Sequence, residues 1–292
     1  METTTLDGPP RLAPRYLRAL LPSRGGGTEL PDRELVLPGA PVDPAELDAY
    51  RRMCGFGLDG RVPVTYPQVL AFAAQVTLMT EPGFPLRLPG LVHLRQRITQ
   101  LRPVAADEPL GLRVHAEALR AHAKGAQVDL VGSAEVDGEP VWAARSTYLA
   151  RGATAPPAAA DEPDEPVPVP ADPARQAARW RVPADTGRRY ASVSGDVNPI
   201  HLHPLTARLF GFPGAIAHGM WTAARCLATL EGRLPEAYEV DVVFGRPVVL
   251  PADVALFSAP DGDGGWRLTL RAAEADRVHL SASVVPSGGA RR

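Results

Sequence analysis

The stretch YPQVLAFAAQVTLM, residues 66–79, carries apolar side chains on every side of a helical projection. A second stretch of the same kind, AHGMWTAARCLATL, occupies residues 217–230. A helix that is apolar all round is buried among other elements instead of lying at a surface. The two stretches therefore predict two core helices, one in each half of the chain, with Gly219 at the start of the second.

The stretches after each predicted core helix alternate between apolar and polar residues, which is typical of strands with one face in solvent. The clearest are AQVDLVGSAEV at 126–136, PVWAARSTYLA at 140–150, WRLTLRAAEA at 266–275 and RVHLSASVV at 277–285. Gly and Asp turns separate the strands of each pair. Each half is thus predicted to contain a short strand, a core helix and an antiparallel meander.

The two halves also share a short motif. Tyr50 and Gly55 match Tyr190 and Gly195 in a common Tyr-x-x-x-(Ser/Cys)-Gly pattern. Because the halves repeat in pattern, we predict an α+β fold of two similar units, each an antiparallel sheet wrapped around its helix, packed side by side as a pseudo-dimer.

A proline-rich, acidic segment, residues 152–173, separates the halves. It holds too few large apolar side chains to pack, and such sequence is extended and solvated. We therefore predict an N-terminal domain at 1–151, a linker at 152–173 and a C-terminal domain at 174–292.

Composition excludes several classes of function. The 292 residues are 45% hydrophobic and 22% charged, which is typical of a soluble globular protein. The net charge of -2 gives no excess of basic residues of the kind that nucleic-acid-binding proteins have. Cys54 and Cys226 lie far apart, with neither zinc-site nor disulfide-scaffold spacing. The apolar patch at 16–21 is shorter than a signal-peptide core, and the apolar stretch at 214–230 is interrupted by polar residues. We expect a cytoplasmic protein that does not span a membrane.

The candidate chemistry lies in YASVSGDVNPIH, residues 190–201. Pro199 lacks an amide proton and steers Asn198 away from helical angles, so the segment from Asp196 to His201 is predicted to be a turn that leads into a helix. A carboxylate and an imidazole that converge on one water can act as general acid and base. Asn198 can brace the loop through backbone hydrogen bonds, as Asx side chains do in turns. The amide of Gly219, at a helix N-terminus, can stabilise an oxyanion.

Each of these pieces also has a plainer interpretation. Asp-x-Asn before a proline is a common turn, and a single histidine after it is more often structural than catalytic. His218 is equally compatible with a core histidine whose hydrogen bonds are satisfied, and Gly219 with close packing alone. Only the combination of these residues in one string favours a catalytic site.

The whole string, YASVSGDVNPIHLHPLTARLFGFPGAIAHGM, resembles the signature of the MaoC-like, (R)-specific enoyl thioester hydratases and 3-hydroxyacyl thioester dehydratases, which have the hotdog fold. The Phe-x-x-Pro at 244–247 is also similar to that family. The resemblance covers residues 179–285 well and the first half only as a degenerate copy. Length and arrangement look most like the double-hotdog dehydratases of actinobacterial fatty-acid metabolism and the two-domain hydratase of peroxisomal β-oxidation.

The resemblance implies roles for individual residues. Asp196, His201 and Gly219 are expected to be catalytic, the first two as the acid-base pair and the third as the oxyanion donor. A larger set is expected to bind substrate or support the site: Ser194, Gly195, Asn198, His218 and Phe244. The family usually has an acidic residue two positions after the catalytic histidine, and here that position is His203.

The implied activity is that of a hydro-lyase: reversible hydration of trans-2-enoyl thioesters to (R)-3-hydroxyacyl thioesters, with acyl-CoA or an acyl carrier protein thioester as substrate. No metal and no other cofactor is expected, because backbone and side-chain hydrogen bonds can stabilise an enolate-like charge. The first half has FGLDGRVPVTYP after Gly55 and lacks the Asp-x-Asn-Pro-x-His motif. We therefore expect one active site, with the first half supplying a groove for a long acyl chain, in a monomeric pseudo-dimer or a homodimer.

Two alternatives remain open from the sequence. A hotdog acyl thioesterase would use a carboxylate on or near the core helix, and the second core helix has none before Glu231, at its far end. A non-catalytic subunit that binds an acyl carrier would keep the motif without turnover. Four arginines are candidates to meet the phosphates of coenzyme A or of a pantetheine arm: Arg188, Arg189, Arg208 and Arg246.

Overall fold

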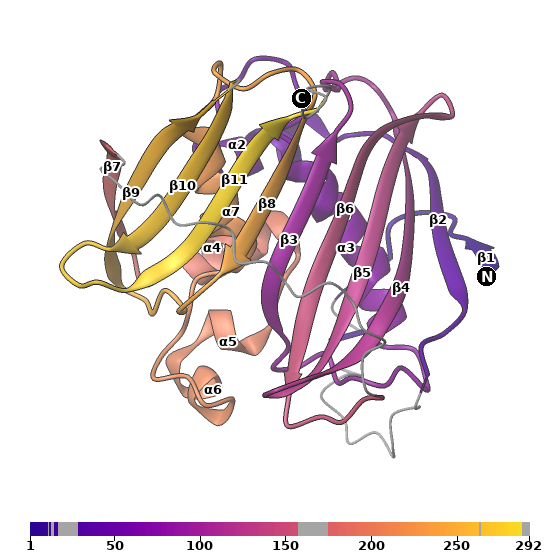
Figure 1. The fold of residues 1–292 in the computed structure, drawn as a ribbon. Coiled ribbons are helices and arrows are strands. Elements are labelled where there is room, and N and C mark those ends of the chain that lie inside the picture. Colours follow the sequence, from indigo (N-terminus) through magenta and orange to yellow (C-terminus); the bar gives the residue numbers. More distant parts are fainter. Residues whose placement is uncertain (11, 13–14, 17–28, 157–174, 263, 288–292) are drawn as a thin grey trace.

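The strands of the two halves join into one sheet in the computed structural model of the protein (Figure 1). The structure describes residues 1–292 except 11, 13–14, 17–28, 157–174, 263 and 288–292. In the first half the strands are β1 (Glu2–Thr5), β2 (Arg33–Ala40), β3 (Val92–Gln100), β4 (Leu110–His122), β5 (Gly125–Val136) and β6 (Glu139–Arg151). In the second half they are β7 (Arg175–Val182), β8 (Tyr238–Phe244), β9 (Ala252–Asp261), β10 (Gly265–Ala272) and β11 (Val278–Pro286).

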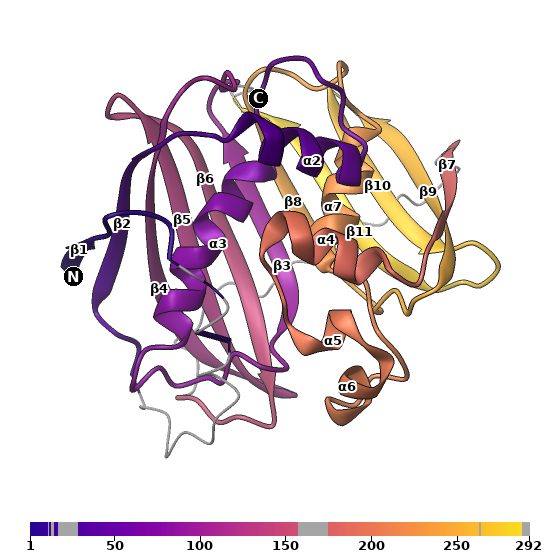
Figure 2. The ribbon, with the colours of Figure 1, turned by 180° about the vertical axis from the view of Figure 1, so that it is seen from behind.

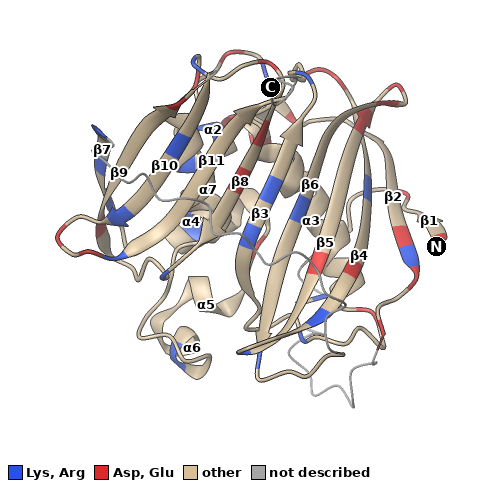
Figure 3. Ribbon diagram, viewed as in Figure 1, with Lys and Arg blue, Asp and Glu red and all other residues tan. Residues whose placement is uncertain are grey.

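The strand order is β1-β2-β4-β5-β6-β3-β8-β11-β10-β9-β7, and every pairing except β1 with β2 is antiparallel. The halves meet where β3 pairs with β8, with Arg95 opposite Val243 and Ile98 opposite Val240. The Arg95 guanidinium also donates to the Asp241 carboxylate across this seam, at 2.8 Å from Nε to Oδ1. Charged residues of both signs occur along these strands (Figure 3). The four strands predicted at 126–136, 140–150, 266–275 and 277–285 are confirmed as β5, β6, β10 and β11.

The helices lie together on one face of the sheet (Figure 2). They are α2 (Pro44–Cys54), α3 (Tyr66–Met79), α4 (Thr186–Ser194), α5 (Pro199–Leu202), α6 (Pro204–Leu209) and α7 (Gly219–Ala228). The predicted core helices are α3 and α7, and the second begins at Gly219 as expected. Apolar side chains of both helices, among them Leu78 and Leu227, are buried in one cluster, and each such side chain stabilises the fold by roughly 1.5–3 kcal/mol.

The shared Tyr-x-x-x-(Ser/Cys)-Gly pattern lies at the C-terminal ends of two helices, α2 and α4. The prediction of a strand, a core helix and a meander in each half did not include these helices. Tyr50 lies on α2 and Tyr190 on α4, and their rings pack 6.2 Å apart, between centroids. Each helix ends at a glycine in the left-handed conformation, Gly55 at φ 84° and Gly195 at φ 71°, a region that residues with a Cβ rarely adopt. The α+β double architecture is thus confirmed. Most of the predicted linker lies outside the described residues, and the domain boundaries stay a prediction.

Candidate active site

The turn predicted between Asp196 and His201 is present. Helix α4 ends at Gly195, and α5 begins at Pro199, whose missing amide proton costs nothing at the first helical position. Asn198 is the N-cap, and its side-chain oxygen accepts from the Ile200 amide at 3.4 Å. The loop therefore projects Asp196 from the end of one helix and His201 from the next.

The Asp196 carboxylate is held by two donors on one oxygen. Oδ1 accepts from the Asn198 amide at 3.1 Å and from the Tyr16 hydroxyl at 3.0 Å. Oδ2 lies 3.8 Å from Nε2 of His218. Burial opposes ionisation, but any positive charge on the adjacent His218 or His201 and the two hydrogen bonds favour the carboxylate, so the pKa of Asp196 lies below its ordinary value. The carboxylate is therefore ionised at neutral pH.

Backbone carbonyls assign the tautomers of two stacked histidines. His201 Nδ1 donates to the Ile216 carbonyl at 2.9 Å, and His218 Nε2 donates to the Asp196 carbonyl at 2.9 Å. Burial lowers the pKa of His201, and it lowers that of His218 to about 3. Both rings are neutral at pH 7, which leaves Nε2 of His201 and Nδ1 of His218 as lone-pair acceptors.

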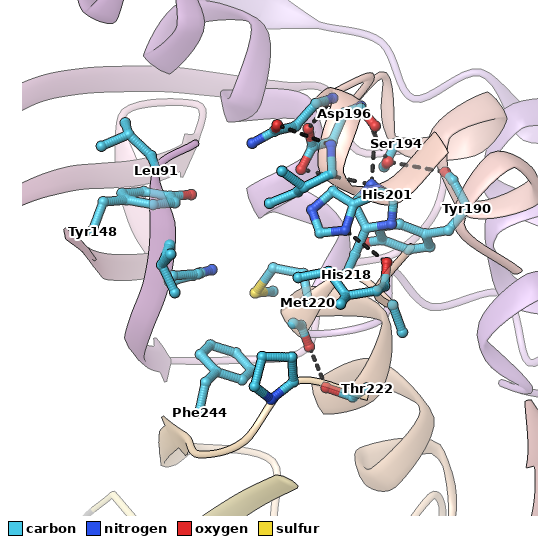
Figure 4. Close-up of a pocket in the computed structure, with 18 of the residues that line it drawn as sticks. Leu91, Tyr148, Tyr190, Ser194, Asp196, His201, His218, Met220, Thr222 and Phe244 are labelled. Carbon is cyan, nitrogen blue, oxygen red and sulfur yellow. Dashed lines mark hydrogen bonds and ion pairs between the residues drawn. The ribbon is translucent and has the colours of Figure 1, made fainter. Parts of the chain in front are cut away.

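Most of the predicted site residues line one pocket (Figure 4). Its lining includes Ser194, Asp196, Asn198, His201, His218, Gly219 and Phe244. Gly195 does not line it and instead ends α4, where Leu12 packs against the backbone. Ser194 supports the loop, because its hydroxyl donates to the Tyr190 carbonyl at 2.9 Å and accepts from the Asp196 amide at 3.3 Å.

Gly219 lies at the first turn of α7, where backbone N–H groups have no partner inside the helix. The preceding His218 gives no side-chain cap, and the described residues provide no hydrogen-bond acceptor for the Gly219 amide. A Cβ at this position would lie 3.0 Å from the Phe244 ring. The amide, the positive end of the helix dipole and the absence of a side chain together make a site for a developing negative charge.

The first half contributes pocket residues that sequence reasoning missed, among them Tyr16, Gln68, His93 and Tyr148. His93 is half-buried and lies between the rings of Tyr148 and Phe244, at centroid distances of 4.5 and 4.8 Å, and desolvation lowers its pKa to about 4. No short motif marks these residues. Tyr16 lies in the apolar patch at 16–21, which is shorter than a signal-peptide core and carries no motif that predicts a role in a site.

Several charged or polar candidates lie elsewhere. His203 caps α6, where its Nδ1 accepts from the Leu205 amide at 3.2 Å, and it is not among the pocket residues. Of the four candidate arginines only Arg246 lines the pocket, and it is exposed. Glu231 lies beyond the end of α7, where its carboxylate accepts from the Gly57 amide at 2.6 Å.

A metal ion is the one cofactor for which the pocket offers a donor set. Asp196, His201 and His218 each present one ligand atom, and these atoms lie within 4.8 Å of one another. One ring nitrogen of each histidine, however, already forms a hydrogen bond with a backbone carbonyl. The same spacing suits a single water, since a hydrogen bond between heavy atoms spans about 2.8 Å.

Fold and pocket together define a double-hotdog protein with an Asp-His pair beside a free helix N-terminus. The MaoC like domain family matches residues 160–277. Over 256 residues the chain is 42% identical to 3-hydroxyacyl-thioester dehydratase X of Mycobacterium tuberculosis, covering 88% of this chain and 90% of that protein. The crystal structure of HtdX from the same organism superposes with a TM-score of 0.77 at 40% identity, over 87% of this chain and 100% of that one. A second M. tuberculosis structure, described as a double hotdog fold, gives a TM-score of 0.50 at 17% identity, over 85% and 93% of the two chains.

This chain belongs to the MaoC-like dehydratase family, as the resemblance of its motif implied. Within the described residues, no helix combines the length and apolar character needed to cross a membrane.

Proposed function

We propose that this protein is a hydro-lyase that interconverts trans-2-enoyl thioesters and (R)-3-hydroxyacyl thioesters. The observation that carries the proposal is the convergence of Asp196 and His201 on one pocket, with ligand atoms within 4.8 Å of each other, beside the amide of Gly219. The dehydratase named in M. tuberculosis, to which the chain is similar over most of its length, supports the same reaction class.

The protonation states fit the binding of a nucleophilic water. An ionised Asp196 and a neutral His201 are both acceptors, so one water can donate a hydrogen to each and turn its oxygen lone pair toward the substrate. His201 is the base in this proposal, because the ordinary pKa of an imidazole lies closer to neutral pH than that of a carboxyl group. We assign the proton transfer to Nε2 of His201, since its Nδ1 is occupied by a carbonyl.

In the hydration direction the water oxygen forms a bond to the β-carbon while its proton passes to His201. The electrons of the double bond move toward the thioester carbonyl, whose oxygen accepts a hydrogen bond from the Gly219 amide. The imidazolium, stabilised by the Asp196 carboxylate, then returns the proton to the α-carbon. Dehydration is the reverse path. Removal of one oxyanion-hole donor costs about 2.7–4 kcal/mol in other enzymes.

The pocket also extends along the first half, which supports a groove for the acyl chain. Gln68, Val69, Phe72 and Met79 line it from α3, with Leu88 and Leu91 beyond that helix. The α3 residues from 68 to 79 span about 16 Å along the helix axis at 1.5 Å per residue. Exposed Arg246 lines the pocket too and is suited to pair with the phosphates of a coenzyme A or carrier-protein thioester.

Hydrolysis of the thioester is less well supported by the site. The acidic residue after the second core helix, Glu231, is engaged by the Gly57 amide and is not a pocket residue. The carboxylate in the pocket is Asp196, on a loop and paired with histidines. This arrangement suits addition of water to a double bond more than activation of water by a carboxylate on the helix.

The test is turnover of a trans-2-enoyl thioester by the wild type and by Asp196→Asn and His201→Gln. We expect the conjugated double bond to be lost without release of free thiol, and each variant to lose at least 100-fold in kcat, within the range typical of a positioned acid or base. Circular dichroism checks that the variants remain folded. Thiol release would indicate a thioesterase, no turnover by the wild type would indicate a binding protein, and full activity of folded variants would end the proposal.

A further inference from the structure

A tyrosine near the N-terminus contacts the catalytic loop. Tyr16 lies 180 positions before Asp196, yet its hydroxyl donates to Oδ1 of that carboxylate at 3.0 Å. Tyr16 is buried with 6% of its surface exposed, and it also lines the pocket. The contact therefore crosses from the first half, which lacks the catalytic motif, into the site of the second half.

We propose that Tyr16 is a positioning residue, which selects the oxygen of Asp196 that holds the reacting water. This inference rests on the proposed function. A carboxylate oxygen has about two acceptor positions. On Oδ1 of Asp196 these are taken by Tyr16 and by the Asn198 amide. Oδ2, which faces His218 at 3.8 Å, is then the oxygen left for water.

Packing keeps the tyrosine in place. Leu12 and Tyr16 lie four residues apart, and each has helical backbone conformation. A Cβ on Gly195 would lie 2.5 Å from Leu12 Cδ1, which shows how closely Leu12 approaches the residue before Asp196. Tyr16 itself packs in a buried cluster with Met79 and Tyr148.

Tyr16 acts as a donor and does not supply a proton. Burial and the adjacent Asp196 charge raise the pKa of its hydroxyl far above the ordinary value, so the phenol stays neutral throughout the working range. A neutral donor on an ionised carboxylate also helps to keep that carboxylate ionised. Loss of the hydroxyl would free Oδ1 and let the carboxylate rotate, which weakens the alignment of water without removing the base.

The deciding experiment is steady-state kinetics of full-length Tyr16→Phe on an enoyl thioester. We expect kcat to fall about tenfold, with KM within twofold of the wild type, because the hydroxyl acts on the water and not on substrate binding. Tyr238→Phe is the matched control, since it removes a buried tyrosine hydroxyl on β8 outside the pocket, and its kcat is expected to stay within twofold. Leu12→Ala, which loosens the same contact without touching the hydroxyl, is expected to lower kcat by a smaller factor.

A double-mutant cycle on thermal stability adds an independent readout. Tyr16→Phe is expected to lower the melting temperature of the wild type and to cause no further decrease in an Asp196→Ala background. A kcat within twofold of wild type in Tyr16→Phe, a change in KM alone, or equal stability losses in both backgrounds would each overturn the inference. The proposed function fails separately, if Asp196→Asn keeps full turnover.

Discussion

The imidazole rings of His201 and His218 are stacked, with centroids 3.7 Å apart and an angle of 26° between their planes. Such a pair cannot carry two charges cheaply, because like charges at this distance repel strongly in a buried site. Burial lowers the pKa of His218, and His201 lowers it further. The stack therefore helps to keep His218 neutral, while burial lowers the pKa of His201, whose neutral form accepts a proton from water.

The pH dependence of turnover follows from this arrangement. His201 and Asp196 must both be unprotonated, and the pKa of each lies below its ordinary value. We expect kcat/KM for hydration to stay level as the pH falls from 8 through about 6.5, the ordinary histidine value, and to drop only below it. Initial rates across a buffer series measure this, and an acid limb centred above pH 7 would contradict the assignment of His201 as a buried neutral base.

Stability is expected to fall on acidification. Histidines that stay neutral in the folded state take up protons when unfolded, so the unfolded state binds more protons below about pH 6.5. The pKa is about 3 for His218 and about 4 for His93. Between pH 6.5 and its own pKa in the folded state, each histidine is expected to lower the free energy of unfolding by up to about 1.4 kcal/mol for each pH unit of acidification.

Denaturant unfolding at pH 7, 6 and 5 measures that slope. His93→Phe keeps an aromatic ring between Tyr148 and Phe244 and removes one titrating group, so its slope is expected to be shallower by the contribution of one histidine. An unchanged slope in this variant would show that His93 is not buried in its neutral form.

The oxyanion site is expected to be sensitive to a single methyl group. In Gly219→Ala the new Cβ would lie 3.0 Å from the Phe244 ring, so the ring or the start of α7 must shift. We expect kcat for an enoyl thioester to drop by about 10- to 1000-fold, as for the loss of an oxyanion donor. Adding Phe244→Leu is expected to recover part of the loss by making room. A fully active Gly219→Ala would show that a Cβ fits beside Phe244 without displacing the amide, which would contradict the expected steric sensitivity of this site.

The proposed acyl groove predicts a loss that depends on chain length. Val69 and its neighbour Leu70 on α3 both pack against the core cluster, but only Val69 also lines the pocket. Val69→Phe is expected to reduce kcat/KM for a long-chain enoyl thioester at least tenfold while leaving a four-carbon substrate within threefold. Leu70→Phe is the control on the same helix. Equal effects on both chain lengths in Val69→Phe would argue against a groove along α3.

A chelator tests the cluster of Asp196, His201 and His218 for a metal. We expect incubation with EDTA followed by desalting to leave the initial rate unchanged, because the Gly219 amide and the helix dipole supply the charge stabilisation that the reaction needs. Loss of activity that is restored by a divalent ion would instead assign these three side chains as ligands.

The local features of the site were predictable from the residues that form them. The apolar stretch at 66–79 predicted α3 with its observed bounds, because full burial requires apolar residues on all sides. Pro199 made a continuous helix impossible, so the turn that presents Asp196 and His201 was predictable from steric rules alone. These features depend on residues within a few positions of each other, and for that reason a sequence pattern can reveal them.

The way in which the two halves share the site depends on packing between distant parts of the chain. Pairing of β3 with β8 joins their sheets, and packing of the first half against α4 to α7 brings Tyr16 to Asp196 and His93 to Phe244. The tautomers of the histidines likewise depend on which carbonyl each ring meets. Contacts between residues a hundred or more positions apart leave no periodicity or spacing in the chain, since they arise from the packing of whole elements.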